Sequence, residues 1–467
     1  MRTQVGLHLN RCVLQGPIFA HNAWVPWLEL FDCRIPFFHA DRIRVDGTLY
    51  LRGLGTTSNT ADSAVRLVGA RIGRNLELDG ACLDNPEGPA LHAEGIHVGR
   101  ALRFRHARAT VSCDTGAVQL VNARVRGDLW LDGTTLTNGH GPVLNAEGLH
   151  VGGSLLLCSG FEAVAKSKEL ATIHLMSARV GSRLDLGVGR RFTGKSFGSE
   201  PEDPEDPEKR ARRPAKIVNT DPSAVTLDLR CATVNELRIP PETVCRPVNG
   251  RCTSTSTVVL AELEYGRLSR ESAHPYWPHW FSVHARPFEA QPYQHLAAVL
   301  RNTGRATEAR EVLIALEDER HQTNESATRG SRIWHWVKKR FIGHGYRPGR
   351  ALVGLAGVFV VALALTWAAS SADVVHRSVP RVQNVSSAVV VEDLPDTDFP
   401  CRFADTIRLA ADLSVPLIST GGRSRCDFKA DGGWAMAATI AGLLLQILGW
   451  AFATLFVVGF TGVVRRF

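Results

Sequence analysis

The sequence of 467 residues contains few of the short motifs that cofactor and metal sites share, and none in the context that such a site needs. No GxGxxG leads from a strand pattern into a helix pattern, so a dinucleotide site is not supported. One GxxxxGKS match occurs, GRRFTGKS (189–196), but it runs into a Pro-rich block and not into a helix pattern, so a nucleoside triphosphate site is not supported either. HExxH and CxxC are missing, and the one GxSxG match, GKSFG (194–198), lies in the same segment, without a strand pattern before it and a helix pattern after it. We therefore predict no catalytic residues, no cofactor and no metal ligands.

The cysteines and the charge balance argue against further classes of site. Cysteines without ligand spacing read as compact core residues, and eight of the ten precede the long apolar runs: Cys12, Cys33, Cys82, Cys113, Cys158, Cys231, Cys245 and Cys252. The net charge of +8 is too diffuse to predict nucleic-acid binding. Residues 1–198 hold 22 Lys/Arg and 17 Asp/Glu, the wrong sign for a protein that mimics DNA.

Charge is absent from two long stretches near the C-terminus, residues 351–372 and 435–464. The apolar core of a bilayer is about 30 Å thick and needs about 20 residues of helix, so both stretches are predicted transmembrane helices. The second is long enough to indicate tilt, or a bend near Gly442 or Gly449. Met1 leads into an alternating strand pattern, so we expect no signal peptide. The lipid bilayer is thus the first predicted partner.

Flanking cations predict the orientation of these helices, because positive residues favour the cytoplasmic side. The cations are Lys338, Lys339, Arg340, Arg347 and Arg350 before the first stretch and Arg465 and Arg466 after the second. The loop between them, residues 373–433, carries nine acidic and seven basic residues. We expect both termini in the cytoplasm of a two-span plasma-membrane protein. Cys401 and Cys426 then lie on the oxidising side, where a disulfide between them is expected.

A repeated unit dominates residues 1–265. It recurs every 25–30 residues and places pairs of apolar residues, two apart, at intervals of five or six. Clear copies are AVRLVGARIGRNLELDGACL (64–83), ALHAEGIHVGRALRFRHARA (90–109), AVQLVNARVRGDLWLDGTTL (117–136), VLNAEGLHVGGSLLLCSGF (143–161) and TIHLMSARVGSRLDLGVGR (172–190). A degenerate copy at 224–240 is expected to close the array, and fainter matches lie at 5–16 and 40–54.

Short apolar pairs of this kind predict one coil of a parallel β-solenoid. Pairs such as Val65/Leu67 have the two-residue period of a strand with inward side chains. About twenty residues would run around four sides, and stacked coils would bury a continuous core. Recurrent glycines are expected at the corners, where positive φ or tight backbone packing is needed: Gly73, Gly99, Gly127, Gly152 and Gly181. Recurrent aspartates are expected to form an outer-face ladder that the repeat itself explains better than catalysis does: Asp79, Asp132 and Asp185.

The rhythm resembles that of pentapeptide-repeat proteins, although it is looser than their five-residue consensus. The whole layout resembles a group of actinobacterial membrane proteins with such repeats and a two-span C-terminus, some of which are labelled membrane-associated oxidoreductases. The likeness is carried by GARIGRNLELDGACL (69–83), QPYQHLAAVLRNTGRATEAREVLIA (291–315) and GHGYRPGRALVGLAG (343–357). The predicted fold is mainly β, a right-handed parallel β-solenoid followed by an α-helical hairpin and two transmembrane helices.

Two segments interrupt this plan. Residues 195–217 include a Pro-rich, acidic-then-basic block, which predicts a disordered insertion, with a charge-driven docking site as the alternative. Residues 266–290 form an aromatic connector with three histidines at five-residue spacing: His274, His279 and His284. That spacing is not typical of zinc, and Pro275 and Pro278 favour an extended loop.

Residues 291–340 have a helical pattern. Leu296, Val299 and Leu300 form one apolar stripe, Thr303-Gly304 breaks it, and a second stripe begins at Ala309. A hairpin of two helices follows, and because it cannot bury both faces we expect it to pack on the solenoid end or against a second copy of the chain, which leaves a homo-oligomer open. The last part, with its Trp and Lys residues, is predicted to be an interfacial helix.

Three functional hypotheses remain open on the sequence. The favoured one is a non-catalytic scaffold that binds a protein partner, and no nucleic acid, on a solenoid face at the cytoplasmic side of the membrane. The second is an enzyme with its active site in residues 241–290 or on a solenoid face. The third is a sensor in which the 373–433 loop signals through the two spans.

Overall fold

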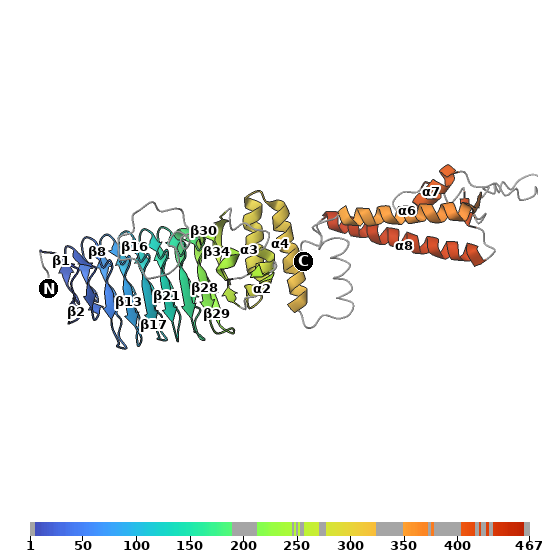
Figure 1. Ribbon diagram of the computed structural model, residues 1–467. Coiled ribbons are helices and arrows are strands. Elements are labelled where there is room, and N and C mark those ends of the chain that lie inside the picture. The colour runs from blue at the N-terminus through green and yellow to red at the C-terminus, as the bar shows by residue number, and fades with distance from the viewer. Residues whose placement is uncertain are drawn as a thin grey trace, which may run out of the picture. The chain divides into compact units, whose positions relative to one another are not determined.

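The computed structural model describes residues 5–188, 213–244, 247–248, 251–252, 256–269, 277–323, 349–371, 375–377, 403–415, 420–421, 426–428 and 433–461. The chain divides into two compact units, Met1–Leu316 and Glu317–Phe467. The first unit is a stack of parallel strands capped by helices, and the second is helical (Figure 1).

The strands form stacked four-sided coils, as the repeats predict. One complete coil contains β10 (Val65–Arg66), β11 (Arg71–Ile72), β12 (Leu76–Glu77) and β13 (Cys82–Asn85), and β14 (Leu91–His92) begins the next. Each strand pairs in parallel with its counterpart one repeat away. This architecture, which we call the coil stack, is β-solenoid-like.

Each side of the coil stack is a parallel sheet or one limb of a sheet. The first side contains β2 (Ile18–Phe19), β6 (Phe38–His39), β10, β14, β18 (Val118–Gln119), β22 (Leu144–Asn145), β26 (Ile173–His174), β29 (Val225–Asp228) and β33 (Thr257–Val259). The second contains β3 (Trp24–Val25), β7 (Arg44–Val45), β11, β15 (His97–Val98), β19 (Arg124–Val125) and β23 (His150–Val151).

The third side contains β1 (Leu7–Asn10), β4 (Leu28–Phe31), β8 (Leu49–Tyr50), β12, β16 (Leu102–Arg103), β20 (Leu129–Trp130) and β24 (Leu155–Leu156). The longer strands β27 (Arg179–Asp185), β30 (Thr233–Arg238) and β34 (Glu264–Leu268) continue both the second and the third side. The fourth contains β5 (Arg34–Ile35), β9 (Gly55–Thr57), β13, β17 (Arg108–Val111), β21 (Thr135–Asn138), β25 (Glu162–Ala165) and β28 (Lys216–Asn219).

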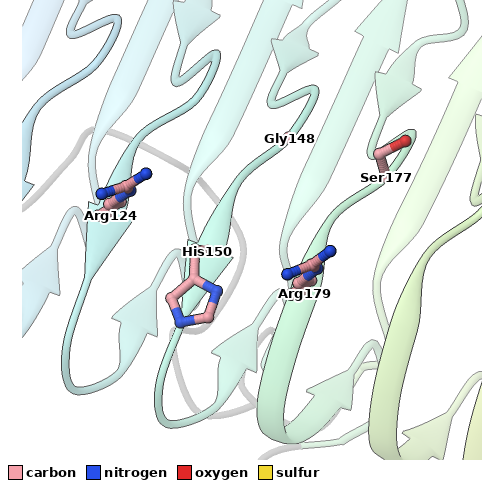
Figure 2. A pocket seen from close by; sticks show the side chains of 5 residues that line it. All are labelled: Arg124, Gly148, His150, Ser177 and Arg179. Carbon is pink, nitrogen blue, oxygen red and sulfur yellow. The ribbon is translucent and has the colours of Figure 1, made fainter.

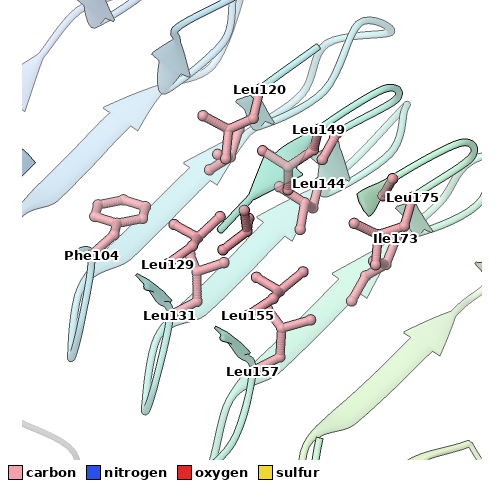
Figure 3. Packing of buried hydrophobic residues seen from close by; sticks show 14 of the residues in the cluster. Phe104, Leu120, Leu129, Leu131, Leu144, Leu149, Leu155, Leu157, Ile173 and Leu175 are labelled. Carbon is pink, nitrogen blue, oxygen red and sulfur yellow. The ribbon is translucent and has the colours of Figure 1, made fainter. Parts of the chain in front are cut away.

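Columns of aliphatic side chains fill the interior. Leu102, Leu129 and Leu155 are in register on neighbouring coils, and each is at most 1% exposed. Figure 3 shows such leucines stacked from coil to coil. No single coil could bury these side chains, so the burial of apolar surface depends on stacking.

The predicted corner glycines serve close packing rather than positive φ. A Cβ on Gly99 would lie 2.1 Å from the carbonyl oxygen of Gly73 on the preceding coil, a distance that backbone cannot accommodate. Positive φ occurs instead at other corners, for example at Gly69 and Gly95. Of the two reasons predicted for glycine at these positions, tight backbone packing is therefore the correct one.

The array is longer than its recognisable repeats. The degenerate copy at 224–240 does not close it, because β33 and β34 pair with β29 and β30 and add strands of a further coil. Strand β28 begins at Lys216, inside the predicted insertion, and pairs with β25. Most of that insertion lies outside the described residues. Between the last coils lie a short 3-10 helix η1 (Pro241–Thr243) and the antiparallel pair β31 (Pro247–Val248) and β32 (Arg251–Cys252).

The connector contains a helix where an extended loop was expected. Helix α2 spans Trp277–His284, and Pro278 lies in its first turn, where the missing N–H of proline costs no helical hydrogen bond. His279 is exposed, whereas His284 is buried and its Nδ1 lies 2.7 Å from the carbonyl oxygen of Ser256. The two imidazoles therefore have different surroundings, and His274 lies outside the described residues.

The predicted helical hairpin is present and packs on the end of the coil stack. It consists of α3 (Gln291–Asn302) and α4 (Ala306–Thr323), with Gly304 at φ +79° in the turn. Leu296 and Leu300 join the same hydrophobic cluster as the coils, and α3 contacts β34. The predicted interfacial helix lies outside the described residues.

The second unit contains two helices long and apolar enough to cross a membrane. They are α6 (Gly349–Ser371) and α8 (Gly433–Thr461). A Cβ on Gly354 of α6 would lie 2.4 Å from the ring of Phe452 on α8, so glycine permits the two helices to approach closely there. The bounds of α6 and α8 lie within a few residues of the two uncharged stretches, 351–372 and 435–464.

In its described residues, the loop 373–433 contains three short elements for which the sequence pattern gives no prediction. They are β35 (Val375–Arg377), α7 (Phe403–Ser414) and β36 (Cys426–Phe428), with β35 and β36 antiparallel. Leu409 and Leu413 of α7 are buried in a cluster with residues of α6. Cys426 is disulfide-bonded, but Cys401, its predicted partner, lies outside the described residues, so the pairing stays a prediction.

Candidate functional site: a basic ladder on one side of the coil stack

Basic side chains form a continuous outward column on the second side of the coil stack. Each rung is the first residue of a strand or of a strand segment, and each is exposed, whereas the next residue is a buried Val or Ile. This alternation follows from the two-residue period of a strand. We call this column the basic ladder, and its rungs are Arg44, Arg71, His97, Arg124, His150 and Arg179.

Strand register fixes the spacing of the rungs. Arg44 pairs with Arg71, Arg71 with His97, and so on to Arg179, without a shift. Neighbouring parallel strands lie about 4.8 Å apart, so the six rungs extend over about 24 Å. Trp24 precedes the ladder in the same column, and Thr233 and Glu264 follow it.

The ladder arginines make no ion pair in the described parts of the chain. Within those parts, none of the four guanidinium groups makes a hydrogen bond either. Among the rung side chains described, only that of His97 makes a hydrogen bond, with its Nδ1 3.0 Å from the carbonyl oxygen of Gly95. Further exposed arginines flank the column near its two corners: Arg42, Arg74, Arg100 and Arg126. Because like charges directly opposite each other on a sheet destabilise it, the packing of the fold does not explain this arrangement.

A shallow, open pocket of about 460 Å³ lies on the ladder. Arg124, His150 and Arg179 line it, together with Gly148 and Ser177 from the neighbouring turns. Figure 2 shows the three ladder side chains leaving three successive strands on the same side of the sheet. Two guanidinium groups and an imidazole around one depression are donors suited to phosphate or carboxylate oxygens.

The third side carries charges of both signs in a column of outward residues, which we call the paired column. Its outward residues in register are Glu29, Tyr50, Glu77, Arg103, Trp130, Leu156, Asp185 and Arg238. Glu77 is 2% exposed and accepts hydrogen bonds from Arg52 and, at 3.3 Å, from Arg103. Asp185 likewise accepts one from Arg238 at 3.1 Å. Opposite charges therefore neutralise one another along this column.

The predicted aspartate ladder is not an outer-face ladder. Asp79 and Asp132 occupy one corner column, but Arg105 lies between them and is bonded to Asp79. Asp185 belongs to the paired column instead. Asp132 and Asp185 are buried, at 7% and 4% exposed. The recurrent aspartates therefore make contacts between coils. This agrees with the expectation that the repeat itself explains them better than catalysis does.

Asp132 is the most perturbed carboxyl on this side. Burial raises its pKa to about 6, although hydrogen bonds from Cys158 oppose the shift. The Cys158 thiol donates to Asp132 Oδ1 at 2.9 Å, and burial raises the thiol pKa as well. A buried thiol with a raised pKa is a poor nucleophile, so this pair is a structural contact.

The ladder itself was not identified from the sequence, although its signal is visible there. The words GARIG, EGIHVG, NARVRG, EGLHVG and SARVG each place Arg or His directly before the buried Val or Ile. Among the described residues, no cluster of three or more His, Cys, Asp or Glu that could hold a metal is found. No protein-family model, curated protein or solved structure matches the chain. Its function therefore has to be argued from this geometry.

Proposed function

We propose that the chain is a membrane-anchored, non-catalytic scaffold whose basic ladder is an anion-binding interaction surface. The observation that carries the proposal is six basic rungs in register, exposed and without an ion pair among the described residues. Their mutual repulsion costs stability, so an external anionic partner is the physical reason to keep them.

The proposal includes finer features of the fold and the membrane arrangement. We propose that the coils are right-handed and of the pentapeptide-repeat kind, in keeping with the resemblance to actinobacterial membrane proteins. α6 and α8 are proposed to cross the plasma membrane with both termini in the cytoplasm, which the flanking cations support. A protein partner on another side of the coil stack remains part of the scaffold proposal.

A charge-matched pair of variants tests the ladder. The ladder variant carries Arg71→Glu, Arg124→Glu and Arg179→Glu, and the control variant carries Arg34→Glu, Arg301→Glu and Arg310→Glu at exposed positions elsewhere on the first unit. The full-length proteins, in detergent, are eluted from a heparin matrix with salt. The ladder variant should elute at distinctly lower salt than the control, because both have the same net charge and only the placement differs.

The topology and the scaffold role have their own tests. Cys231 is exposed and not disulfide-bonded, so a membrane-impermeant thiol reagent added to intact cells reports the location of the coil stack. Labelling of Cys231 from outside would contradict the proposed orientation. Affinity purification from membranes should recover a protein partner, and a stoichiometric flavin or metal in the purified protein would contradict the non-catalytic scaffold.

A second candidate function, a two-span sensor, has one observation in its favour. Helix α7, from the loop between the spans, packs on α6, and the Thr366 hydroxyl donates to the Thr406 carbonyl oxygen at 3.4 Å. A change in the loop would therefore reach a predicted span directly. If deletion of residues 373–433 left every phenotype of the gene intact, the sensor would be excluded.

A further inference from the structure

We propose that the partner of the basic ladder is the anionic phospholipid headgroup layer of the same membrane in which the chain is anchored. The inference rests on the proposed function and narrows it from anions in general to one surface. On this account the coil stack lies with its second side against the membrane and leaves its other sides open to the cytoplasm.

The length of the chain keeps this surface within reach of the ladder at all times. Helix α4 ends at Thr323 and α6 begins at Gly349, and even a fully extended segment of that length spans no more than about 90 Å. Anionic lipid is therefore present at high local concentration wherever the tether is anchored, whereas a soluble anion has to be captured from dilute solution.

The spacing of the rungs favours a fluid surface over a fixed polymer. Rungs recur every 4.8 Å or so along the coil axis, whereas same-side carboxylates of an extended acidic peptide recur about every 6.7 Å. A rigid ladder and such a peptide fall out of register within a few rungs. Lipid headgroups diffuse laterally, so they need no fixed register with the rungs. The arginines all lie on one side of the sheet and can contact a planar layer together.

The side-chain chemistry points the same way. Guanidinium groups bind phosphate oxygens in a bidentate manner, and each cation near an anionic bilayer contributes about 1 kcal/mol to association, within a screening length of about 8 Å. Binding of single-stranded nucleic acid usually adds aromatic platforms for the bases. From Arg44 to Arg179 the column contains no Phe, Tyr or Trp.

Residue-level arginine footprinting tests the inference on the full-length protein. The chain is reconstituted in lipid nanodiscs that contain either phosphatidylcholine alone or phosphatidylcholine with phosphatidylglycerol. An arginine-specific dicarbonyl reagent is added, and the modification rates of Arg71, Arg124 and Arg179 are read by mass spectrometry against Arg34 and Arg301 as internal controls. The ladder arginines should react about fivefold or more slowly in anionic discs, and high salt should abolish the difference.

Further arms separate the alternatives. Equal ladder rates in the two disc types overturn the lipid inference. Protection by poly-glutamate or by a single-stranded oligonucleotide in phosphatidylcholine discs, without protection by phosphatidylglycerol, also overturns it but leaves the proposed anion-binding function intact. Protection in phosphatidylcholine discs without any added polyanion would indicate an occupant from the chain itself and would likewise overturn it. If none of these anions protects the ladder, the proposed function fails together with the inference.

Discussion

The basic ladder and the paired column are outward columns of the same sixteen-stranded sheet, a few residues apart in each coil, yet they treat charge in opposite ways. In the paired column, Glu77 is almost fully buried between Arg52 and Arg103. In the ladder, Arg44 and Arg71 are direct register neighbours of the same sign, and both are exposed. In the first arrangement the buried charge is compensated, so removing one partner would destabilise the stack, whereas the second places like charges side by side and costs stability.

The largest expected effect comes from a substitution that breaks the ion pairs of the paired column. Glu77→Gln removes the carboxylate between Arg52 and Arg103 and leaves two guanidinium groups without their counter-charge. We expect a loss of about 2 to 3 kcal/mol in the free energy of unfolding, because charge-assisted hydrogen bonds to a buried acceptor are lost while each guanidinium stays about a third exposed to water. It is measured by denaturant titration of the full chain and followed by circular dichroism. The matched ladder substitution, Arg124→Gln, should change it by less than about 0.5 kcal/mol. Equal losses at both positions would erase the distinction between the columns.

The next effect comes from Asp132 and depends on pH. Because its pKa in the fold, about 6, is higher than its ordinary value, the folded protein holds a proton that the unfolded chain releases, and stability falls as pH rises towards 6. Asp132→Asn removes the buried charge. The variant should be more stable than the wild type by about 2 kcal/mol at pH 8, and the gain should shrink towards zero near pH 4. A gain that does not vary with pH would show that burial of the charge is not its cause.

A smaller effect is expected from a substitution in the basic ladder. Arg71→Thr relieves the repulsion from Arg44 and places a good strand former on the sheet. The free energy of unfolding should rise by about 0.5 kcal/mol, while binding to polyanions weakens. Arg34→Thr, on the fourth side, serves as the control because its register partner is Gly55. A loss of stability above about 1 kcal/mol at Arg71 would assign this guanidinium a structural role.

The smallest effect concerns salt. Repulsion between exposed rungs is screened at high ionic strength, whereas the buried pairs of the third side are screened much less. Raising NaCl should therefore stabilise the wild type by a few tenths of a kcal/mol relative to the ladder variant. A salt response that is the same in both proteins would mean that the rungs do not repel one another measurably.

Sequence periodicity predicted most of the fold, because side chains that must be buried recur with the period of the structure that buries them. The pairs of inward residues identified the four-sided coils, and the uncharged stretches identified both apolar helices. The ladder was missed because the repeat was defined by its pairs of inward apolar residues, and the outward Arg or His directly before the buried Val or Ile was left out of that definition. Register between coils, which brings Arg124 beside His150, becomes visible only once the strands are paired.

Other features depended on tertiary contacts that periodicity does not express. Helix α2 was not predicted because Pro278 was taken to favour an extended loop, although proline is compatible with a first turn; the helix is held by Trp277, Trp280 and Phe281, which are buried against the end of the coil stack. The final coil was hidden because η1 and the β31–β32 pair separate it from the preceding repeat. In both cases packing against the stack supplies information that the local sequence pattern lacks.

Whether the basic ladder is the anion-binding surface can be measured by the salt dependence of binding between the full-length protein and a fluorescent heparin oligosaccharide. The slope of log K against log salt reports how many charge contacts form. For the control variant (Arg34→Glu, Arg301→Glu, Arg310→Glu) the slope should match that of the wild type. For the ladder variant (Arg71→Glu, Arg124→Glu, Arg179→Glu) it should be shallower by about three contacts. Equal slopes for the two variants would contradict the assignment of the basic ladder as the anion-binding surface.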